Sequence, residues 1–403
     1  MSGEMKQSGV VIVGGGPAGL TAAITLAAAA IPTMLVGKRP ARPDNRTTAL
    51  LAGSVTALAT LGVWEACAAH AAPLRGMRII DDTGRLWRAP EVKFEATEIG
   101  LNAFGQNIEN RLLIAALEQR ARALPALRMM EAEVRAIEPG EREAVVRLED
   151  GEALVASLAI GADGRKSLAR TAAGIAVDER RYPQSALTVC LGHTRAHLDI
   201  SAEFHTPSGP FTLVPLPGLR SSLVCVLDPE TAEQIAALDD AALSGEIERR
   251  SHSILGKISV EQDRGLFPLT SATAQRFADK RIALIGEAAH VIPPIGAQGL
   301  NLGLRDAASI GELVVAAHRA HADLGGANLL AHYNEQRRAD VASRSMAIDL
   351  INRSLLSDFL PVQGARGLGL YLIDRIGPLR RAVMREGLAP ASKEPRLMRG
   401  EVL

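Results

Sequence analysis

The stretch Arg281–Asp306, RIALIGEAAHVIPPIGAQGLNLGLRD, is the most informative segment of this sequence. Its first part, Ile282–Ile285, is wholly apolar and predicts a short buried strand. Pro293 and Pro294 exclude a helix at the next positions, and the glycines that follow allow the backbone to approach a flat or charged ligand. The segment then predicts a helix whose first N–H groups are free to bind an acceptor. The whole stretch therefore predicts a ligand-binding loop between a buried strand and a helix.

A second glycine-rich segment lies near the N-terminus. Val10–Val13 predicts a buried strand, and the sequence GGGPAG that follows matches GxGxxG at Gly14, Gly16 and Gly19. A predicted helix and a second strand, Thr33–Val36, complete the unit. In such a unit the glycines permit a tight turn close to a pyrophosphate, whose negative charge is favoured at the helix N-terminus. The segment predicts a dinucleotide-binding, Rossmann-type domain.

One position departs from the dinucleotide-binding pattern. An acidic residue is expected after the second strand, where it would hold the ribose hydroxyls, but the chain has Gly37 followed by Lys38 and Arg39. Taken alone, the two cations favour a 2′-phosphate and hence NADP. The alternative is that Lys38 and Arg39 are solvated surface charges.

Two further segments place charged residues beside predicted helices. The apolar run Ala159–Ala162 predicts a strand that ends in Asp163-Gly164, at the edge where ligands bind in doubly wound sheets. Asp44–Leu50, DNRTTAL, predicts a polar turn before a helix, with Thr47 or Thr48 as its cap.

Composition excludes several classes of protein. The 403 residues carry a net charge of zero, which argues against a nucleic-acid-binding protein. The three cysteines are far apart and predict neither a metal site nor disulfides. The apolar run Leu20–Ile31 is too short to span a membrane, and the polar N-terminal residues predict no secretory signal. We therefore expect a cytoplasmic protein.

Three motifs together carry a family resemblance. The first two are GxGxxG at 14–19 and DGxxSxxR at 163–170. The third is the ligand-binding loop within Arg281–Asp306, which has Gly286, His290, Pro294, Gln298 and Gly299 at matching positions. This set resembles the class A flavoprotein aromatic hydroxylases. DNRTTAL at 44–50, ENRLL at 109–113 and QGLNLGLRDA at 298–307 are similar to the ubiquinone-biosynthesis hydroxylases of that class.

The resemblance implies FAD as the cofactor, which outweighs the NADP interpretation, and either NAD(P)H or a partner protein as the electron donor. It places the Gly14–Gly19 turn and Arg111 at the pyrophosphate, Asp163 at the pyrophosphate and ribityl chain, and the 296–301 loop along the pyrimidine side of the flavin. The implied cofactor-binding positions are Gly14, Gly16, Gly19, Arg46, Arg111, Asp163, Gly164, Gly286, Glu287, Pro294, Gly296, Ala297, Gln298, Gly299 and Asn301.

Catalysis in this family is centred on the flavin, and Arg46 is the only side chain that we consider as a catalytic candidate. His290 is interpreted as a packing and hydrogen-bonding residue, and no metal is expected. Gly37, Glu287 and Ala297 depart from the family pattern, which has an acid, an aspartate and a glycine at these positions. We expect weaker FAD retention from the first of these changes.

The resemblance also implies the fold and its division. We expect an α/β fold with a doubly wound FAD-binding domain, an inserted β-rich substrate domain and a helical C-terminal region. We assign to the FAD-binding domain residues 1–75, 99–178 and 276–360. The substrate domain comprises residues 76–98 and 179–275, and the C-terminal region comprises residues 361–403.

The implied reaction is hydroxylation of a prenylated phenol or quinol with O₂, through a flavin C4a-hydroperoxide, in ubiquinone biosynthesis. A hydroxylase or epoxidase of another aromatic or secondary metabolite is the first alternative. A non-catalytic scaffold of a ubiquinone-biosynthesis complex is the second, and membership of such a complex is also compatible with an active enzyme.

The C-terminal segment 364–386 alternates apolar residues with arginines. It predicts one amphipathic helix, which either docks on the core or lies on the inner face of the membrane.

Overall fold

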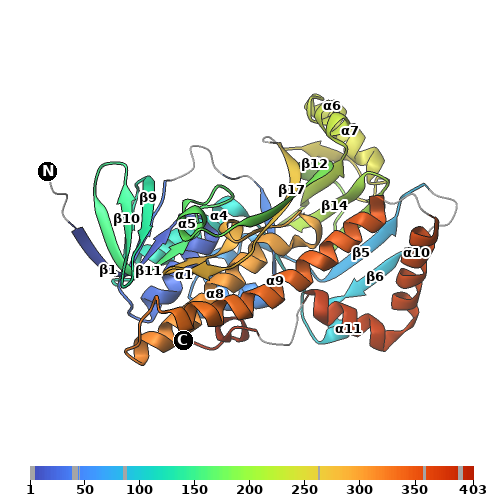
Figure 1. Ribbon diagram of the computed structural model, residues 1–403. Coiled ribbons are helices and arrows are strands. Elements are labelled where there is room, and N and C mark those ends of the chain that lie inside the picture. Colours follow the sequence, from blue (N-terminus) through green and yellow to red (C-terminus); the bar gives the residue numbers. More distant parts are fainter. Residues whose placement is uncertain are drawn as a thin grey trace.

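The computed structural model describes residues 5–38, 44, 46–84, 89–261, 264–356, 360–388 and 394–403. Two large sheets organise these residues, and Figure 1 shows the first beside the N-terminus and the second on the opposite side of the molecule. A small third sheet, formed by β3 (Thr47–Leu51), β7 (Gly105–Glu109) and β4 (Ala71–Pro73), contacts β14 of the second sheet and helix α4 (Asn110–Arg122), which also contacts β8 of the first sheet.

The first sheet has the parallel centre of a doubly wound domain, in the order β18-β19-β11-β1-β2-β8. Its parallel strands are β1 (Met5–Val13), β2 (Thr33–Val36), β8 (Leu127–Met130), β11 (Ala153–Gly161) and β19 (Ile282–Leu284). The antiparallel strands are β9 (Val134–Pro139), β10 (Ala144–Leu148) and β18 (Ala278–Asp279). The fold class expected from the sequence is confirmed.

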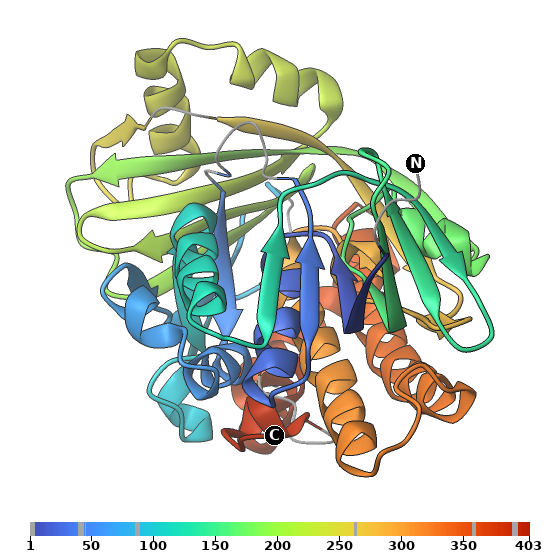
Figure 2. The same cartoon turned by 90° about the vertical axis from the view of Figure 1, so that its left-hand side faces the viewer.

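Helices pack against this sheet because the C-terminal halves of its central strands β1 and β11 are apolar. Val10, Ile12 and Ile160 are completely buried in one large core with residues of the helices. The helices of this part are α1 (Pro17–Ala28), α4 (Asn110–Arg122), α5 (Leu168–Ala173), α8 (Gln298–Arg319) and α9 (Ala327–Leu356). Helix α1 contacts α4 and α8, and Figure 2 shows α8 and α9, in orange, side by side.

The second sheet has the order β20-β17-β12-β15-β14-β13-β5-β6, with β16 paired to β12. Its strands are β5 (Gly76–Asp81), β6 (Val92–Glu95), β12 (Val177–His193), β13 (Ile200–Thr206), β14 (Gly209–Leu216), β15 (Arg220–Leu227), β16 (Ile258–Val260), β17 (Gly265–Ala274) and β20 (His290–Val291). Helices α6 (Pro229–Ala236) and α7 (Asp240–Arg250) pack on it through a separate apolar core. The assignment of 76–98 and 179–275 to one domain stays a prediction, which the parallel pairing of β5 with β13 supports.

Residues 47–51 correct one expectation. They form β3 (Thr47–Leu51), which pairs with β7 (Gly105–Glu109), and α2 (Ala52–Thr60) begins only after it. Thr47 and Thr48 therefore lie in a strand, and the prediction that one of them caps the helix is wrong. The remaining elements here are η1 (Ala96–Ile99), α3 (Trp64–Ala68) and β4 (Ala71–Pro73).

The C-terminal segment forms two helices instead of the single helix expected, α10 (Leu360–Arg375) and α11 (Gly377–Leu388). Gly377-Pro378 explains the break, since proline restricts the residue before it and lacks an N–H. Helix α11 docks through buried Met384 on the β5–β6 edge, and Arg380 binds Glu98 at 2.6 Å. The last residues, with η4 (Arg396–Arg399), return to pack against α2 and α8. Within the described ranges, no helix combines the length and the hydropathy required to cross a membrane.

Candidate functional site

The glycine turn between β1 and α1 has the geometry that its sequence predicts. Gly14 has a φ of +117°, and a Cβ there would lie 2.1 Å from the carbonyl oxygen of Ala162. A Cβ on Gly19 would lie 2.0 Å from the carbonyl oxygen of Gly14. By contrast, a Cβ on Gly16 meets no atom within 4 Å, and no side chain caps α1. The turn is therefore closely packed against the sheet and open in front of the helix N-terminus.

That open space fits a pyrophosphate. The first N–H groups of α1 have no partner inside the helix, and the helix dipole favours negative charge at this end. Because Gly15 and Gly16 carry no side chain, an anion can approach their backbone.

Gly37 lies directly beneath the same turn. A Cβ on Gly37 would lie 2.6 Å from the backbone nitrogen of Gly15, so an acidic side chain would force the turn to shift. Lys38 forms an ion pair with Glu133, whose hydrogen bond raises the pKa of Lys38. Lys38, which the NADP interpretation assigned to a 2′-phosphate, therefore has a partner within the protein. Arg39 lies outside the described residues.

The second motif adjoins the first. Asp163 accepts hydrogen bonds from Ser167 Oγ at 2.6 Å and from the N–H of Ala169 at 3.1 Å. The aspartate therefore orders the start of α5. Arg170 donates to the carbonyl oxygens of Ala288, at 2.9 Å, and Arg165. The hydrogen bond from Arg170 to Ala288 therefore links the second motif to the third.

The third motif meets the start of α1. A Cβ on Gly286, whose φ is +59°, would lie 3.2 Å from the Cβ of Ala18. Glu287 is about half exposed and faces Arg165 of the second motif, with 3.3 Å between Arg165 Nε and Glu287 Oε2. The structure thus brings all three motifs together around the N-terminus of α1.

The loop before α8 holds the remaining predicted positions of this motif. Pro294 and Gly296 lead to Ala297, which is the N-cap residue of α8 and has a φ of +53°. Gln298 begins the helix, and a Cβ on Gly296 or Gly299 meets no atom within 4 Å. The backbone of this loop is therefore accessible to a flat ligand.

Asn301 has a structural role that the sequence did not predict. Its amide nitrogen donates to the carbonyl oxygens of Ala49, at 2.8 Å, and Ala297, at 2.6 Å. Its amide oxygen accepts from the N–H of Leu51 at 2.8 Å. Asn301 therefore fixes the loop to β3.

Arg46 and Arg111 lie near one another, because the N–H of Asn110 donates to the carbonyl oxygen of Arg46. Arg46 binds Asp44 at 2.7 Å, and its guanidinium lies 5.3 Å from the ring centre of Phe267 on β17. The hydrogen bond with Asp44 raises the pKa of Arg46, and the charge of Glu287 also acts on it.

Arg111 occupies the first turn of α4 and binds Glu109 at 2.7 Å, and Glu109 also binds Arg220 of the second sheet at 3.2 Å. The ion pair of Arg111 with Glu109 thus leads toward Arg220 and the second sheet.

Sequence reasoning missed a set of buried charges behind these loops. Asp306 on α8 is completely buried and accepts hydrogen bonds from the N–H of Gly286 and from His290 Nε2, at 2.9 and 2.6 Å. Arg337 on α9 binds its other oxygen at 2.6 Å. Burial raises the pKa of Asp306, but the charges of His290 and Arg337 outweigh burial and keep the pKa below its usual value. His290 is a packing and hydrogen-bonding residue in this geometry, as its sequence context indicated.

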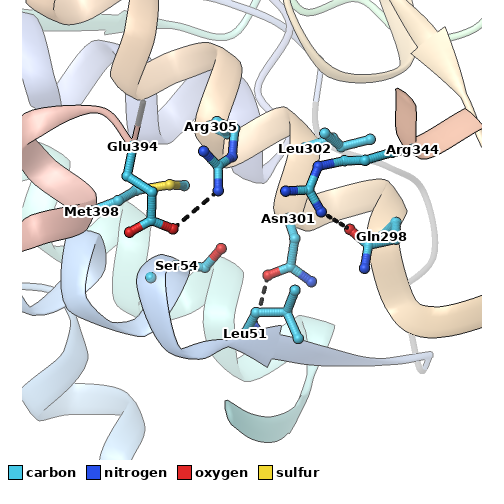
Figure 3. Close-up of a pocket in the computed structure, with 10 residues that line it drawn as sticks. Leu51, Ser54, Gln298, Asn301, Leu302, Arg305, Arg344, Glu394 and Met398 are labelled. Carbon is cyan, nitrogen blue, oxygen red and sulfur yellow. Dashed lines mark hydrogen bonds and ion pairs between the residues drawn. The ribbon is translucent and has the colours of Figure 1, made fainter. Parts of the chain in front are cut away.

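Three further charged residues, Arg305, Arg344 and Glu394, border a pocket beside the N-terminal half of α8. Figure 3 shows Arg305 directed at Glu394, and Arg344 at Gln298. The pairs join α8 to the C-terminal segment and to α9. The spacing of Arg337, Asp340 and Arg344 along one face of α9 was the available signal in the sequence. Among the residues that the structure describes, no group of three potential metal ligands is found.

Comparisons with known proteins agree with this geometry. Residues 7–347 match the family described as FAD binding domain. The ubiquinone hydroxylase UbiL of Rhodospirillum rubrum is 35% identical over 98% of this chain and 93% of its own length. The 3-demethoxyubiquinol 3-hydroxylase of Escherichia coli is 31% identical over 94% of this chain and 98% of its own length. The structure of p-nitrophenol 4-monooxygenase PnpA from Pseudomonas putida superposes with a TM-score of 0.79, at 18% identity, over 97% of this chain and all of PnpA.

Proposed function

The chain belongs to the FAD-binding-domain family and is an FAD-dependent monooxygenase, and from this premise we propose that it hydroxylates the ring of a prenylated phenol or quinol in ubiquinone biosynthesis. The observation that carries the proposal is the similarity to UbiL, which covers nearly the whole of both chains. The hydroxylases among the relatives favour an active enzyme over a scaffold.

The described residues fit the cofactor in this proposal. The backbone at Gly15 and Gly16 receives the pyrophosphate at the N-terminus of α1. Glu287 offers a half-exposed carboxylate to the ribityl hydroxyls, and Arg165 orients it. The open backbone at Gly296 and Gly299 accepts the flavin ring.

Bound FAD supplies the electron transfer and oxygen chemistry, with NAD(P)H as the proposed electron donor. The protein residues position the reactants and keep water away. Arg46 lies between Asp44 and Phe267, so it joins the proposed cofactor site to the strand β17 of the second sheet. We assign the ring of the substrate to this boundary.

Cofactor and substrate are tested separately. A purified chain that shows no flavin absorption after FAD is added contradicts the cofactor assignment. For the substrate, deleting the gene should cause a prenylated ubiquinone precursor that lacks a hydroxyl group to accumulate, as detected by mass spectrometry. Turnover of small soluble phenols without turnover of prenylated precursors would favour the alternative substrate class.

We also propose that helices α10 and α11 contact a membrane that holds the substrate. Although α11 is docked through Met384, this helix pair exposes apolar side chains, with exposed fractions from 36% to 57% at Leu368, Tyr371, Leu372, Ile376, Leu379 and Val383. The exposed arginines Arg375, Arg381 and Arg385 lie on the same helices. Apolar side chains with neighbouring cations fit a surface of anionic lipid.

Binding to vesicles tests this contact. The triple variant Leu372→Ser, Ile376→Ser, Leu379→Ser should bind phosphatidylglycerol vesicles more weakly than the wild type. Leu219→Ser is the matched control, since Leu219 is 49% exposed in the turn after β14. Equal binding by all three proteins would contradict the proposal. Membership of a ubiquinone-biosynthesis complex stays a prediction, which co-purification with tagged protein tests.

A further inference from the structure

A continuous network of buried and partly buried charges joins α8 to α9. Arg337 is 2% exposed, and its Nε donates to Asp306 while its Nη1 donates to Asp340, both at 2.6 Å. Asp340 then accepts from Arg344 Nε at 3.0 Å, and Arg344 Nη1 donates to Gln298 Oε1 at 3.0 Å. The network therefore ends on the side chain of Gln298, the first residue of α8.

The other end of the network reaches a second loop. Asp306 accepts hydrogen bonds from the N–H of Gly286 and from His290. Gly286 and Gln298 thus lie at the two ends of one chain of interactions that passes through α9. Both belong to the loops that the proposed function places at FAD, so a displacement of α9 would alter both loops.

Asp340 is the centre of this network. Three arginines approach it, with Arg305 Nε at 3.5 Å in addition to Arg337 and Arg344. Glu394 binds the far side of Arg305 at 3.1 Å (Figure 3). The three arginines face the carboxylates of Asp306, Asp340 and Glu394, so removing any one of these six charges changes the local charge next to α8 by one unit. Because these side chains are at most 22% exposed, that unit is screened less than a charge on the open surface.

We propose that Arg344, which binds Gln298, and its partner Asp340 set the local charge at the N-terminus of α8. This inference rests on the proposed function, in which that N-terminus lies beside the pyrimidine edge of FAD. Positive charge at this edge stabilises the negative charge that reduction adds to a flavin. Arg344 raises the reduction potential through this effect, and Asp340 lowers it.

A purely structural role makes a different prediction. Arg344→Gln and Asp340→Asn break the same ion pair, so loosening of the loop would move the potential in the same direction in both variants. The two substitutions change the charge with opposite sign, since one removes a cation and the other an anion. Opposite shifts in potential are therefore specific to an electrostatic role.

The experiment uses the full chain loaded with FAD. Spectroelectrochemical titration should show a more negative midpoint for Arg344→Gln, a more positive midpoint for Asp340→Asn, and a midpoint near that of the wild type for the double variant. Arg338→Gln is the matched control, because Arg338 is the exposed neighbour of Arg337 on the same helix, and its midpoint should not move. FAD affinity and apoprotein melting temperature are measured in parallel.

Several results would overturn the inference. Shifts of the same sign in both single variants, or unchanged midpoints with lowered melting temperatures, leave Arg344 and Asp340 with a structural role only. If Asp340→Asn does not fold, Arg344→Lys replaces it: this variant keeps the charge, and a shift equal to that of Arg344→Gln refutes the electrostatic role. A wild-type chain that binds no FAD overturns the proposed function and the inference together, whereas FAD binding with parallel shifts overturns the inference alone.

Discussion

Replacing Ala297 by glycine tests the backbone strain in the loop before α8. Ala297 has φ +53° and ψ +31°, in the left-handed region, at the N-cap position of the helix. The family resemblance implied a glycine at this position, so the substitution restores the residue that the conformation favours. We expect Ala297→Gly to stabilise the folded chain.

The expected magnitude follows from two opposing contributions. A left-handed conformation costs an L-residue about 1–2 kcal/mol, and glycine avoids this cost. Glycine also gives the unfolded chain more conformations, which removes about 0.4–1 kcal/mol of the gain. The net stabilisation therefore lies between about 0 and 1.6 kcal/mol, with a central value of about 0.8 kcal/mol.

Urea unfolding of the wild type, Ala297→Gly and Ala316→Gly measures this difference. Ala316 is exposed inside α8, so glycine there should destabilise the protein by about 1 kcal/mol. The two variants should thus move the midpoint in opposite directions. If Ala297→Gly destabilises the chain as much as Ala316→Gly does, the reasoning from the left-handed backbone is wrong.

Four further predictions concern the same part of the molecule and the cysteines. Gly16→Ala should leave the melting temperature of the apoprotein unchanged, because the new Cβ enters open space, and should weaken FAD binding, because that space is the proposed pyrophosphate site. Gly14→Ala should fail to fold, because the new Cβ would lie 2.1 Å from the carbonyl oxygen of Ala162. Asn301→Ala loses three hydrogen bonds and should cost about 3 kcal/mol in denaturant unfolding, at about 1 kcal/mol each. The pKa of Asp306 is lowered in the folded chain, so its carboxyl binds a proton more weakly there than in the unfolded chain. The stabilisation by Asp306 is therefore full above about pH 4 and is lost as the pH falls through the folded pKa. The variant Asp306→Asn should be less stable at pH 7 by about 3–5 kcal/mol and should lose this acid dependence. Burial raises the pKa of Cys67 and Cys190 to about 11 and of Cys225 to about 12, so thiol labelling at pH 8 should be slow until the chain is denatured.

Local patterns explain why much of the first sheet was predicted. The strand, glycine turn and helix at the N-terminus depend on neighbouring residues, since the apolar run specifies β1 and the glycines specify the turn. The same holds for the buried strand β19 and the loop after it. In contrast, β3 was missed because its pairing partner β7 lies far along the chain, so the pattern from Thr47 to Leu51 alone does not reveal the strand.

The buried charges on α9 could not be recognised without the tertiary structure. In the sequence, Arg337, Asp340 and Arg344 have the spacing of an ordinary solvated helix face. In the fold, α9 packs against α8, and this contact removes Arg337 and Asp306 from water. Burial turns a common surface pattern into a network that is costly to disrupt.

The sequence by itself determined the family, the cofactor and the loops that carry the cofactor-binding motifs, because glycine spacing and apolar runs act over a few residues. Only the tertiary structure decided what the departures from the family pattern mean. A Cβ added to Gly37 would lie 2.6 Å from the backbone nitrogen of Gly15. Ala297 has a left-handed backbone conformation, and its carbonyl oxygen accepts a hydrogen bond from Asn301. These consequences depend on contacts between segments distant in sequence, which no local pattern encodes.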